Sequence, residues 1–173
     1  MQSIEKPKDG EFPPYANIYI QLLPDDGLLL KHLKNNFVVT KQLILPLAED
    51  ILNYTYAENK WTIKEILVHI IDDERIFAYR ALRFARNDKT ELPGFEQDDY
   101  VLYSRAAGRS MANIFEEYEA VRDSTIALFN GLPCEAFLRM GTANNNKATV
   151  RALAYHIAGH ELHHVNIIKE KYL

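Results

Sequence analysis

Residues 60–88 read KWTIKEILVHIIDDERIFAYRALRFARND and contain the clearest helix start in the chain. Thr62 and Glu65 have the T-x-x-E spacing of a capping box, in which each side chain accepts a hydrogen bond from the other residue's backbone N–H. Apolar residues then recur on one helical face, at Ile66, Ile70 and Phe77. The pattern predicts an amphipathic helix from Thr62 to about Arg86.

Three further segments have helical periodicity, and they cover residues 25–51, 110–132 and 149–173. Pro46 should kink or end the first of them, because proline has no backbone N–H to donate. Asn130-Gly131 is a typical C-terminal stop for the second, and Thr149 precedes the start of the third. No segment shows convincing period-2 alternation, so we expect little strand. Four long amphipathic helices predict an all-α fold, a four-helix bundle.

Two segments fall outside these helices. Residues 1–24 contain four prolines and should form an extended N-terminal arm across the bundle. Residues 88–108, between the second and third long helices, are too long and too rich in turn formers for a simple connector. Phe95, Tyr100 and Tyr103 in this loop could wall a pocket. A length of 173 residues fits a single domain spanning 1–173.

Composition narrows the function classes. The net charge of -4 gives no basic face for nucleic acid, and no apolar run approaches the roughly 20 residues of a membrane span. Cys134 is the only cysteine, so no disulfide framework exists, and the N-terminal residues lack the apolar region of a signal peptide. We expect a cytoplasmic protein with a small-molecule substrate, without nucleic-acid or membrane partners.

His160 and His164 lie one helical turn apart within the apolar arc that Leu153, Ile157 and Ile168 define on the last helix. Unpaired buried imidazoles are costly. Histidines at i and i+4 can place both rings on one metal ion, which removes the need for two separate partners. The alternative is a pair of core histidines with separate hydrogen-bond partners and no metal.

A third ligand must come from another helix. His156 and His164 are eight residues apart, about 12 Å along the axis, whereas a metal holds ring nitrogens at about 2.0–2.1 Å. Outside the last helix the chain offers only His32 and His69. His32 lies near a polar helix end, while His69 flanks the apolar face of the helix at residues 62–86. We therefore predict a metal site of His69, His160 and His164 with an open fourth position.

The letters of residues 160–164, HELHH, also match the H-E-x-x-H motif of zinc proteases. The rest of the chain argues against that interpretation. Downstream, only Glu170 could complete such a site, and it lies on the same helix, turned away from His164. Glu161 is expected at the edge of the apolar face. His156 and His163 are expected to be pocket, surface or ligand-supporting residues.

Three acidic residues near His69 are candidates for proton transfer. Asp72 and Asp73 follow His69 by three and four residues, so either could accept a hydrogen bond from the second ring nitrogen of a ligand. Glu74 falls inside the apolar arc, where a carboxylate needs an arginine partner or a raised pKa. Arg122 or Arg80 could form a structural ion pair with it.

The chain resembles the DinB/YfiT-like superfamily. The resemblance rests on the helix at residues 60–74, on the loop sequence LPGFEQDDY at residues 92–100 and on GHELHHVNII at residues 159–168, and it spans roughly residues 28–172. The FPPY opening at residues 12–15 is also similar to the N-terminal arm of YfiT-like members. The resemblance implies a four-helix bundle, commonly dimeric, with Zn²⁺ or Ni²⁺ held by histidines matching His69, His160 and His164.

The resemblance also implies a range of activities. Family members with known activities are mainly thiol-dependent transferases, with bacillithiol or mycothiol as the low-molecular-weight thiol, and many others are described only as metal-dependent hydrolases. A metal on three neutral imidazoles can activate either a thiol or a water, so the triad alone does not choose. We expect a thiol S-transferase acting on small electrophiles, with two alternatives: a hydrolase, and a non-catalytic metal-binding stress-response protein. A basic pocket from Arg80, Arg83, Arg105 or Arg109 would favour transfer.

Overall fold

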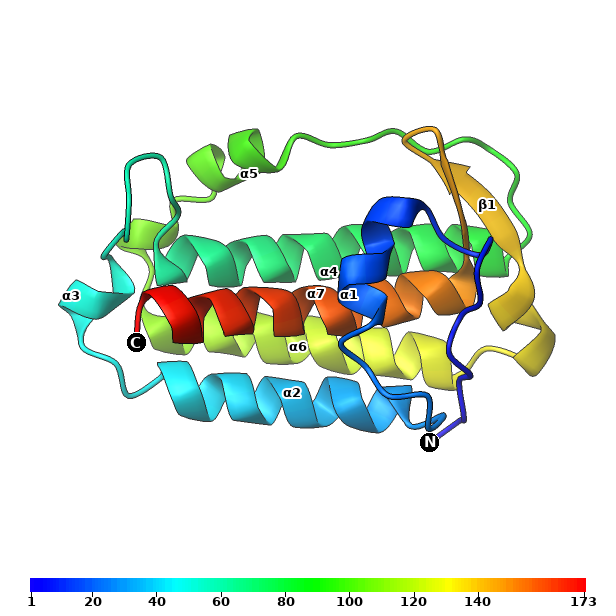
Figure 1. Cartoon of the computed structure of the whole chain (residues 1–173), viewed down its shortest axis with the longest axis horizontal. Helices are drawn as coiled ribbons and strands as arrows, with labels where there is room; N and C mark the ends of the chain where they lie inside the picture. The colour runs from blue at the N-terminus through cyan, green and yellow to red at the C-terminus, as the bar shows by residue number, and fades with distance from the viewer.

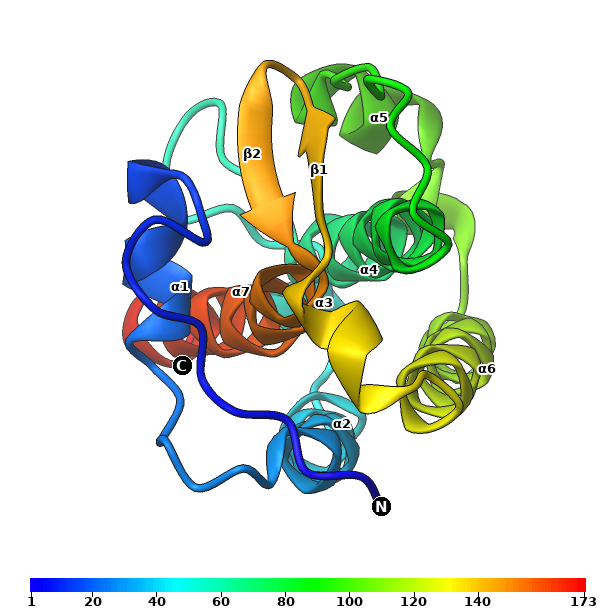
Figure 2. The ribbon, with the colours of Figure 1, turned by 90° about the vertical axis from the view of Figure 1, so that its right-hand side faces the viewer.

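Four long helices build the molecule, and the computed structural model describes all of residues 1–173. They are α2 (Leu29–Ile44), α4 (Ile63–Ala85), α6 (Met111–Asn130) and α7 (Val150–Lys171). Viewed end-on in Figure 2, they form a ring in which α2 contacts α6, α6 contacts α4, α4 contacts α7, and α7 contacts α2. The predicted all-α four-helix bundle is confirmed.

Short elements complete the chain. The helical ones are the 3-10 turns η1 (Pro14–Ala16), η2 (Ala106–Gly108) and η3 (Cys134–Leu138) and the helices α1 (Asn17–Ile20), α3 (Glu49–Leu52) and α5 (Gln97–Tyr103). One two-stranded antiparallel sheet pairs β1 (Met140–Ala143) with β2 (Asn146–Thr149). No helix is both long enough and apolar enough to cross a membrane.

Helix boundaries follow the local chemistry. The predicted capping box forms at Thr62 and Glu65 and starts α4, which ends at Ala85 as expected. The helix predicted over residues 25–51 is shorter, because Asp26 accepts a hydrogen bond from the Leu28 backbone N–H and Gly27 has a φ of 70°, which turns the chain before α2. Pro46 ends α2, and α3 is a separate turn.

The polar stretch before the last helix forms a hairpin that the sequence pattern did not reveal. Asn144 and Asn145 have φ values of 50° and 60°, the left-handed conformation that a two-residue hairpin turn requires and asparagine tolerates. Each strand is only four residues long, too short for a convincing alternation of side chains. The backbone of Leu92 pairs with the outer end of β1 and ties the 86–110 connection to the hairpin.

The long connection between α4 and α6 has a topological reason. These two helices run in the same direction, so the chain must travel back along the bundle before α6 can begin, and α5 forms on the way (Figure 1). This return path covers one side of α4, where it can close over side chains that α4 and α7 present.

The N-terminal arm lies across α7 at the hairpin end (Figures 1 and 2). It was expected to be extended, but residues 14–20 form η1 and α1, and α1 packs on α7. Gly159 permits this contact, since a Cβ atom there would lie 2.2 Å from the backbone oxygen of Tyr19. Arg151 of α7 forms ion pairs with Glu5 and Glu11 of the arm.

The apolar core is divided into two clusters, one at each end of the bundle. One cluster contains buried residues between Leu29 and Leu33 of α2, between Phe77 and Ala85 of α4 and between Val150 and Ala158 of α7. The other contains buried residues of α2 from Phe37 onward and of α4 up to Ile71, together with Ile168 of α7. Between them lies a layer of buried polar side chains: His69, Asp73, Glu74, Arg122, His160 and Glu161. The three predicted ligands are at this level.

Candidate metal centre

The three predicted ligands meet between α4 and α7. His160 Nε2 lies 3.1 Å from His69 Nε2 and 3.1 Å from His164 Nε2, and one ligand atom from each ring lies within 4.8 Å of the others. His69 and His160 are buried, and His164 is partly exposed. Bundle packing has therefore brought together residues that are 91 positions apart in the sequence.

Hydrogen bonding alone does not account for this convergence. His160 Nδ1 lies 3.4 Å from Asp73 Oδ2, so a proton on Nδ1 faces the carboxylate and leaves a single lone pair on Nε2. That lone pair can accept one hydrogen bond, yet two ring nitrogens lie at 3.1 Å. Ligand nitrogens of a tetrahedral zinc site are about 3.3–3.4 Å apart, given bonds of about 2.0–2.1 Å. Two of the three separations here are close to that value, and the third is at most 4.8 Å. The donor set therefore fits a divalent metal ion.

The environment keeps the rings neutral, as metal ligation requires. Burial lowers the pKa of His160 to about 3 and that of His164 to about 2, and it also lowers the pKa of His69. At neutral pH each ring has a free lone pair. The cluster of ligand atoms contains these three histidines and no carboxylate. A tetrahedral metal ion held there would have one position left for a water or a substrate.

Aromatic rings enclose the triad on two sides. Trp61 lies with its ring centroid 4.8 Å from that of His69 and stacks on His164 at 6.4 Å. Tyr19, from α1, meets His160 edge-on at 5.3 Å and contacts His156 and His163 in the same way. Neither residue was predicted. Tyr19 belongs to the arm and carries no periodic signal, and Trp61 precedes the helix cap.

The three predicted acidic residues have different surroundings. Asp73 lies within ion-pair distance of both His160 and His156, at 3.4 and 3.3 Å, so it is placed to orient a ligand ring. Asp72 instead faces Arg75, at 3.7 Å. Glu74 forms a buried ion pair with Arg122, at 2.9 Å, which is the structural alternative considered from the sequence. Neither Asp72 nor Glu74 forms a hydrogen bond or ion pair with a triad residue.

Glu161 faces away from the triad, into the polar layer. Its carboxylate is fully buried, lies 2.9 Å from Arg122 Nη2 and accepts a hydrogen bond from Thr40 Oγ1. We expected Glu161 at the edge of the apolar face, and this prediction is wrong. It is fully buried, because Thr40 of α2 and Arg122 of α6 cover that side of α7. A glutamate held there cannot activate a metal-bound water, so the H-E-x-x-H spacing at 160–164 does not form a protease site.

Two cavities flank the triad. The Trp61 cavity, of about 300 Å³, is lined by Trp61, Lys60, Tyr172 and His164 among others. The Arg80 cavity, of about 290 Å³, is lined by Arg80, Asp73, His156 and His160 among others. Gln97 and Asp98 of α5 line both cavities and mark their junction. Asp98 was not predicted, because the connection at residues 92–100 has no helical period that would relate its side chains to the triad.

The remaining candidates are distributed around this centre. His156 stacks on Phe77 at 3.7 Å in the Arg80 cavity, and His163 is half-buried beside Tyr19. His32 lies away from the site, and its ring nitrogen Nε2 is 2.8 Å from a carboxylate oxygen of Asp26. Arg83 and Arg109 pair with Asp88 and Glu117, so of the four predicted basic residues only Arg80 lines a cavity beside the triad. Phe95 also lines it, whereas Tyr103 is 80% exposed.

These features define a four-helix bundle with a three-histidine candidate metal centre between two of its helices. The sequence profile of the DinB superfamily matches residues 32–168, which include all three histidines. The chain belongs to the DinB superfamily.

A solved structure supports the fold. YfiT from Bacillus subtilis, described as a probable metal-dependent hydrolase with an unusual four-helix bundle topology, superposes with a TM-score of 0.76. The match covers 96% of this chain and 91% of YfiT, at 14% identity. A search of curated proteins found no match.

Proposed function

We propose that the protein is a metal-dependent enzyme, with a Zn²⁺ or Ni²⁺ ion held by His69, His160 and His164, that transfers a low-molecular-weight thiol to a small electrophile. The observation that carries the proposal is the convergence of three neutral Nε2 atoms beside two cavities. A divalent ion on uncharged ligands supplies Lewis-acid chemistry, which favours the thiolate over the thiol.

The two cavities favour a reaction with two substrates. The Trp61 cavity contains Lys60 and three aromatic side chains, Tyr56, Trp61 and Tyr172, at the His164 side of the triad, and the Arg80 cavity contains Arg80 at the His160 side. A thiol in one and an electrophile in the other would meet at the triad. The sulfur then forms a bond to the electrophilic carbon, and the leaving group departs with the electron pair of its own bond.

Two carboxylates have separate roles in this scheme. Asp73 orients the His160 ring through Nδ1. Asp98 lies at the junction of the cavities and accepts the proton that the thiol releases. The roles first considered for Asp72 and Glu74 pass to Asp98, since their carboxylates face Arg75 and Arg122.

Hydrolysis is the second candidate, favoured by the description of YfiT as a probable metal-dependent hydrolase. The same donor set can lower the pKa of a water, and Asp98 could accept its proton. A non-catalytic metal-binding role is the third. One cavity would suffice for hydrolysis of a small substrate, which is why we place transfer first.

The experiment compares the two reactions in one preparation. Zinc- or nickel-loaded protein is assayed with cysteine and monochlorobimane for thiol transfer, and with p-nitrophenyl acetate for hydrolysis. Transfer should exceed the uncatalysed rate, and Asp98→Asn should lower kcat/KM by about 10²-fold or more with the metal content unchanged. Metal-dependent ester hydrolysis without transfer would favour the hydrolase, and neither activity in loaded protein would leave the non-catalytic role.

A further inference from the structure

Arg80 is the one buried lysine or arginine that forms no ion pair with a carboxylate. Four lysine and arginine side chains are buried: Lys64, Arg80, Arg122 and Arg151. The other three form ion pairs with Glu49, with Glu74 and Glu161, and with Glu5 and Glu11. Since a buried charge is costly without a counter-charge, the isolation of Arg80 requires an explanation.

The contacts of Arg80 hold the guanidinium without neutralising it. Its Nη2 donates a hydrogen bond to the Pro93 carbonyl oxygen at 3.0 Å, which uses one of five N–H donors. The Phe77 ring lies 4.9 Å and the Phe95 ring 5.9 Å from Cζ. Burial lowers the pKa of Arg80 below its ordinary value, and the charge of Asp73, which is too far away to form an ion pair, opposes this shift only in part.

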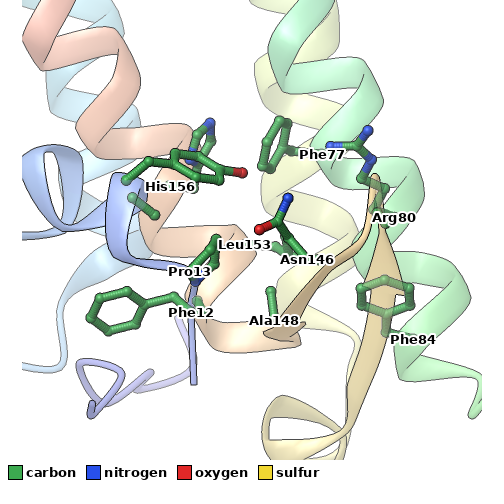
Figure 3. Close-up of a pocket in the computed structure, with 13 residues that line it drawn as sticks. Phe12, Pro13, Phe77, Arg80, Phe84, Asn146, Ala148, Leu153 and His156 are labelled. Atoms are coloured by element: carbon green, nitrogen blue, oxygen red, sulfur yellow. The ribbon is translucent and has the colours of Figure 1, made fainter. Parts of the chain in front are cut away.

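The guanidinium faces a continuous space that leads to the triad. Arg80 lines the Arg80 cavity and also a small inner pocket of about 20 Å³, which shares Tyr15, Phe77 and His156 with that cavity. Figure 3 shows the inner pocket between Phe77 and Arg80 of α4, His156 and Leu153 of α7, Asn146 of β2 and Phe12 of the arm. A space of this size accommodates a water-sized group, such as one carboxylate oxygen.

We propose that Arg80 binds the carboxylate of the substrate in the Arg80 cavity, so that the enzyme takes small aromatic or otherwise apolar monocarboxylates. This inference rests on the proposed function, because it places the reactive end of the same molecule at the triad. His156 lies between the two ends, with its ring 5.4 Å from His160 and 3.7 Å from Phe77.

Two features select the substrate class. The planar guanidinium fork matches a carboxylate in two parallel hydrogen bonds, and the flanking Phe77 and Phe95 favour an apolar or aromatic body next to it. Asp73, Glu96 and Asp98 line the same cavity, so a ligand with two or more negative charges would be repelled. A single carboxylate satisfies both conditions.

Binding of benzoate and of benzamide, its uncharged analogue, tests the proposal. Ligand-detected NMR titrations would use the zinc-loaded chain and the same chain stripped of metal. The wild type should bind benzoate more tightly than benzamide, and Arg80→Met should weaken benzoate binding about ten-fold or more while benzamide is unaffected. Arg83→Met is the matched control, because Arg83 lies on the same helix and already pairs with Asp88; it should bind benzoate like the wild type.

Three results would overturn the proposal: equal benzoate affinity in wild type and Arg80→Met, no saturable benzoate binding, or loss of binding only in His160→Ala, which would place the carboxylate on the metal. If Arg80→Met does not fold, Arg80→Lys replaces it, because lysine keeps the charge but loses the fork. Unchanged benzoate affinity in Arg80→Lys would also count against the two-pronged contact. Zinc content, measured separately, reports on the proposed function, and the metal-free titration reports on Arg80 alone.

Discussion

Asp73 is the carboxylate that contacts the candidate metal centre from the side of His160 Nδ1. Outer carboxylates of this kind fix the ring orientation and raise ligand basicity, and their loss typically costs 10–100-fold in metal affinity. We therefore expect Asp73→Asn to weaken Zn²⁺ binding by about that factor with the fold retained. Competition with a fluorescent zinc chelator measures the affinity.

Asp72 provides the control, because its carboxylate is one residue away and faces Arg75 instead. Asp72→Asn should leave the zinc affinity within about three-fold of wild type, well short of the loss expected for an orienting carboxylate. Equal losses in both variants would mean that negative charge near the site, rather than the contact with His160, sets the affinity.

Arg122 joins α6 to α4 and α7 through two buried carboxylates. It pairs with Glu74 and Glu161 and donates to the backbone oxygen of Leu33. Arg122→Met would leave both carboxylates buried without a counter-charge, so we expect the free energy of unfolding to fall by about 3–5 kcal/mol. Urea denaturation measures it, and Arg75→Met, at a half-exposed surface pair, should cost at most about 1 kcal/mol. A loss below that level in Arg122→Met would mean that the layer does not depend on this charge.

At the residue scale, the spacing of the histidines was enough to predict the triad. His160 and His164 lie one turn apart on an apolar arc, and His69 was the better placed of the two remaining histidines. Asp98, Tyr19 and Trp61 could not be assigned, because they lie on short elements or beside a cap, where no period relates a side chain to the core. Glu161 was expected at the edge of the apolar face because only aliphatic residues were used to define the buried side of the last helix. The buried side also includes a layer of polar side chains, to which Glu161 belongs.

At the scale of elements, the packing of α1 on α7 decides the position of Tyr19. Gly159 has no room for a Cβ atom, which would meet Tyr19 backbone atoms at 2.2 and 2.6 Å. Although alanine has the higher helix propensity, Gly159→Ala must push α1 outward, and we expect a net loss of about 1–3 kcal/mol together with a changed Tyr19 environment. Urea denaturation and near-ultraviolet circular dichroism report the two effects.

Gly108 is the matched control for that substitution, because nothing lies within 4 Å of its Cβ position. Gly108→Ala should leave both the stability and the Tyr19 signal unchanged. If Gly159→Ala were as stable as wild type with an unchanged spectrum, the close approach of α1 and α7 would be contradicted.

Helices were predictable wherever the sequence carries both a period and a stop signal. The capping box at Thr62, Pro46, and Gly131 after α6 all mark observed boundaries. The hairpin at residues 140–149 was not predicted, because its strands are four residues long and its turn uses two asparagines in place of the more telling asparagine-glycine pair. The turn at Asp26 and Gly27 shortened α2 for a similar local reason.

At the scale of the whole molecule, the N-terminal arm completes both the fold and the Arg80 cavity. Arg151 hydrogen bonds hold the pKa of Glu11 below its ordinary value of 4.5, so the folded state binds this proton less tightly than the unfolded chain. The stabilisation is therefore present above about pH 4.5 and is lost as the pH falls below it.

We expect Glu11→Gln to weaken stability at neutral pH and to flatten its decline between about pH 5 and pH 3. Urea titrations across this range measure the effect. Glu5→Gln is the comparison, because the Glu5 side chain is 79% exposed and should matter less. Identical pH profiles for wild type and Glu11→Gln would show that the arm does not depend on this ion pair.

The polar layer between the two apolar clusters contains residues that stabilise the fold and residues of the candidate site. It contains both the Arg122 network, which ties α4, α6 and α7 together, and the histidines that α4 and α7 present to the cavities. The return path from α4 to α6 then brings Asp98 over the triad. No single segment of the sequence contains the whole candidate site, because the order and packing of the helices bring its residues together.

The cross-helix metal site is tested most directly by metal content. Tag-free wild type and His69→Ala would be compared by mass spectrometry, with circular dichroism to confirm that both are folded. We predict about one divalent ion per chain in the wild type and loss of most of it in His69→Ala, because two histidines on one helix leave the ion with too few protein ligands. A folded His69→Ala protein that keeps its metal, or a wild type that takes up no metal on reconstitution, would contradict the cross-helix metal site.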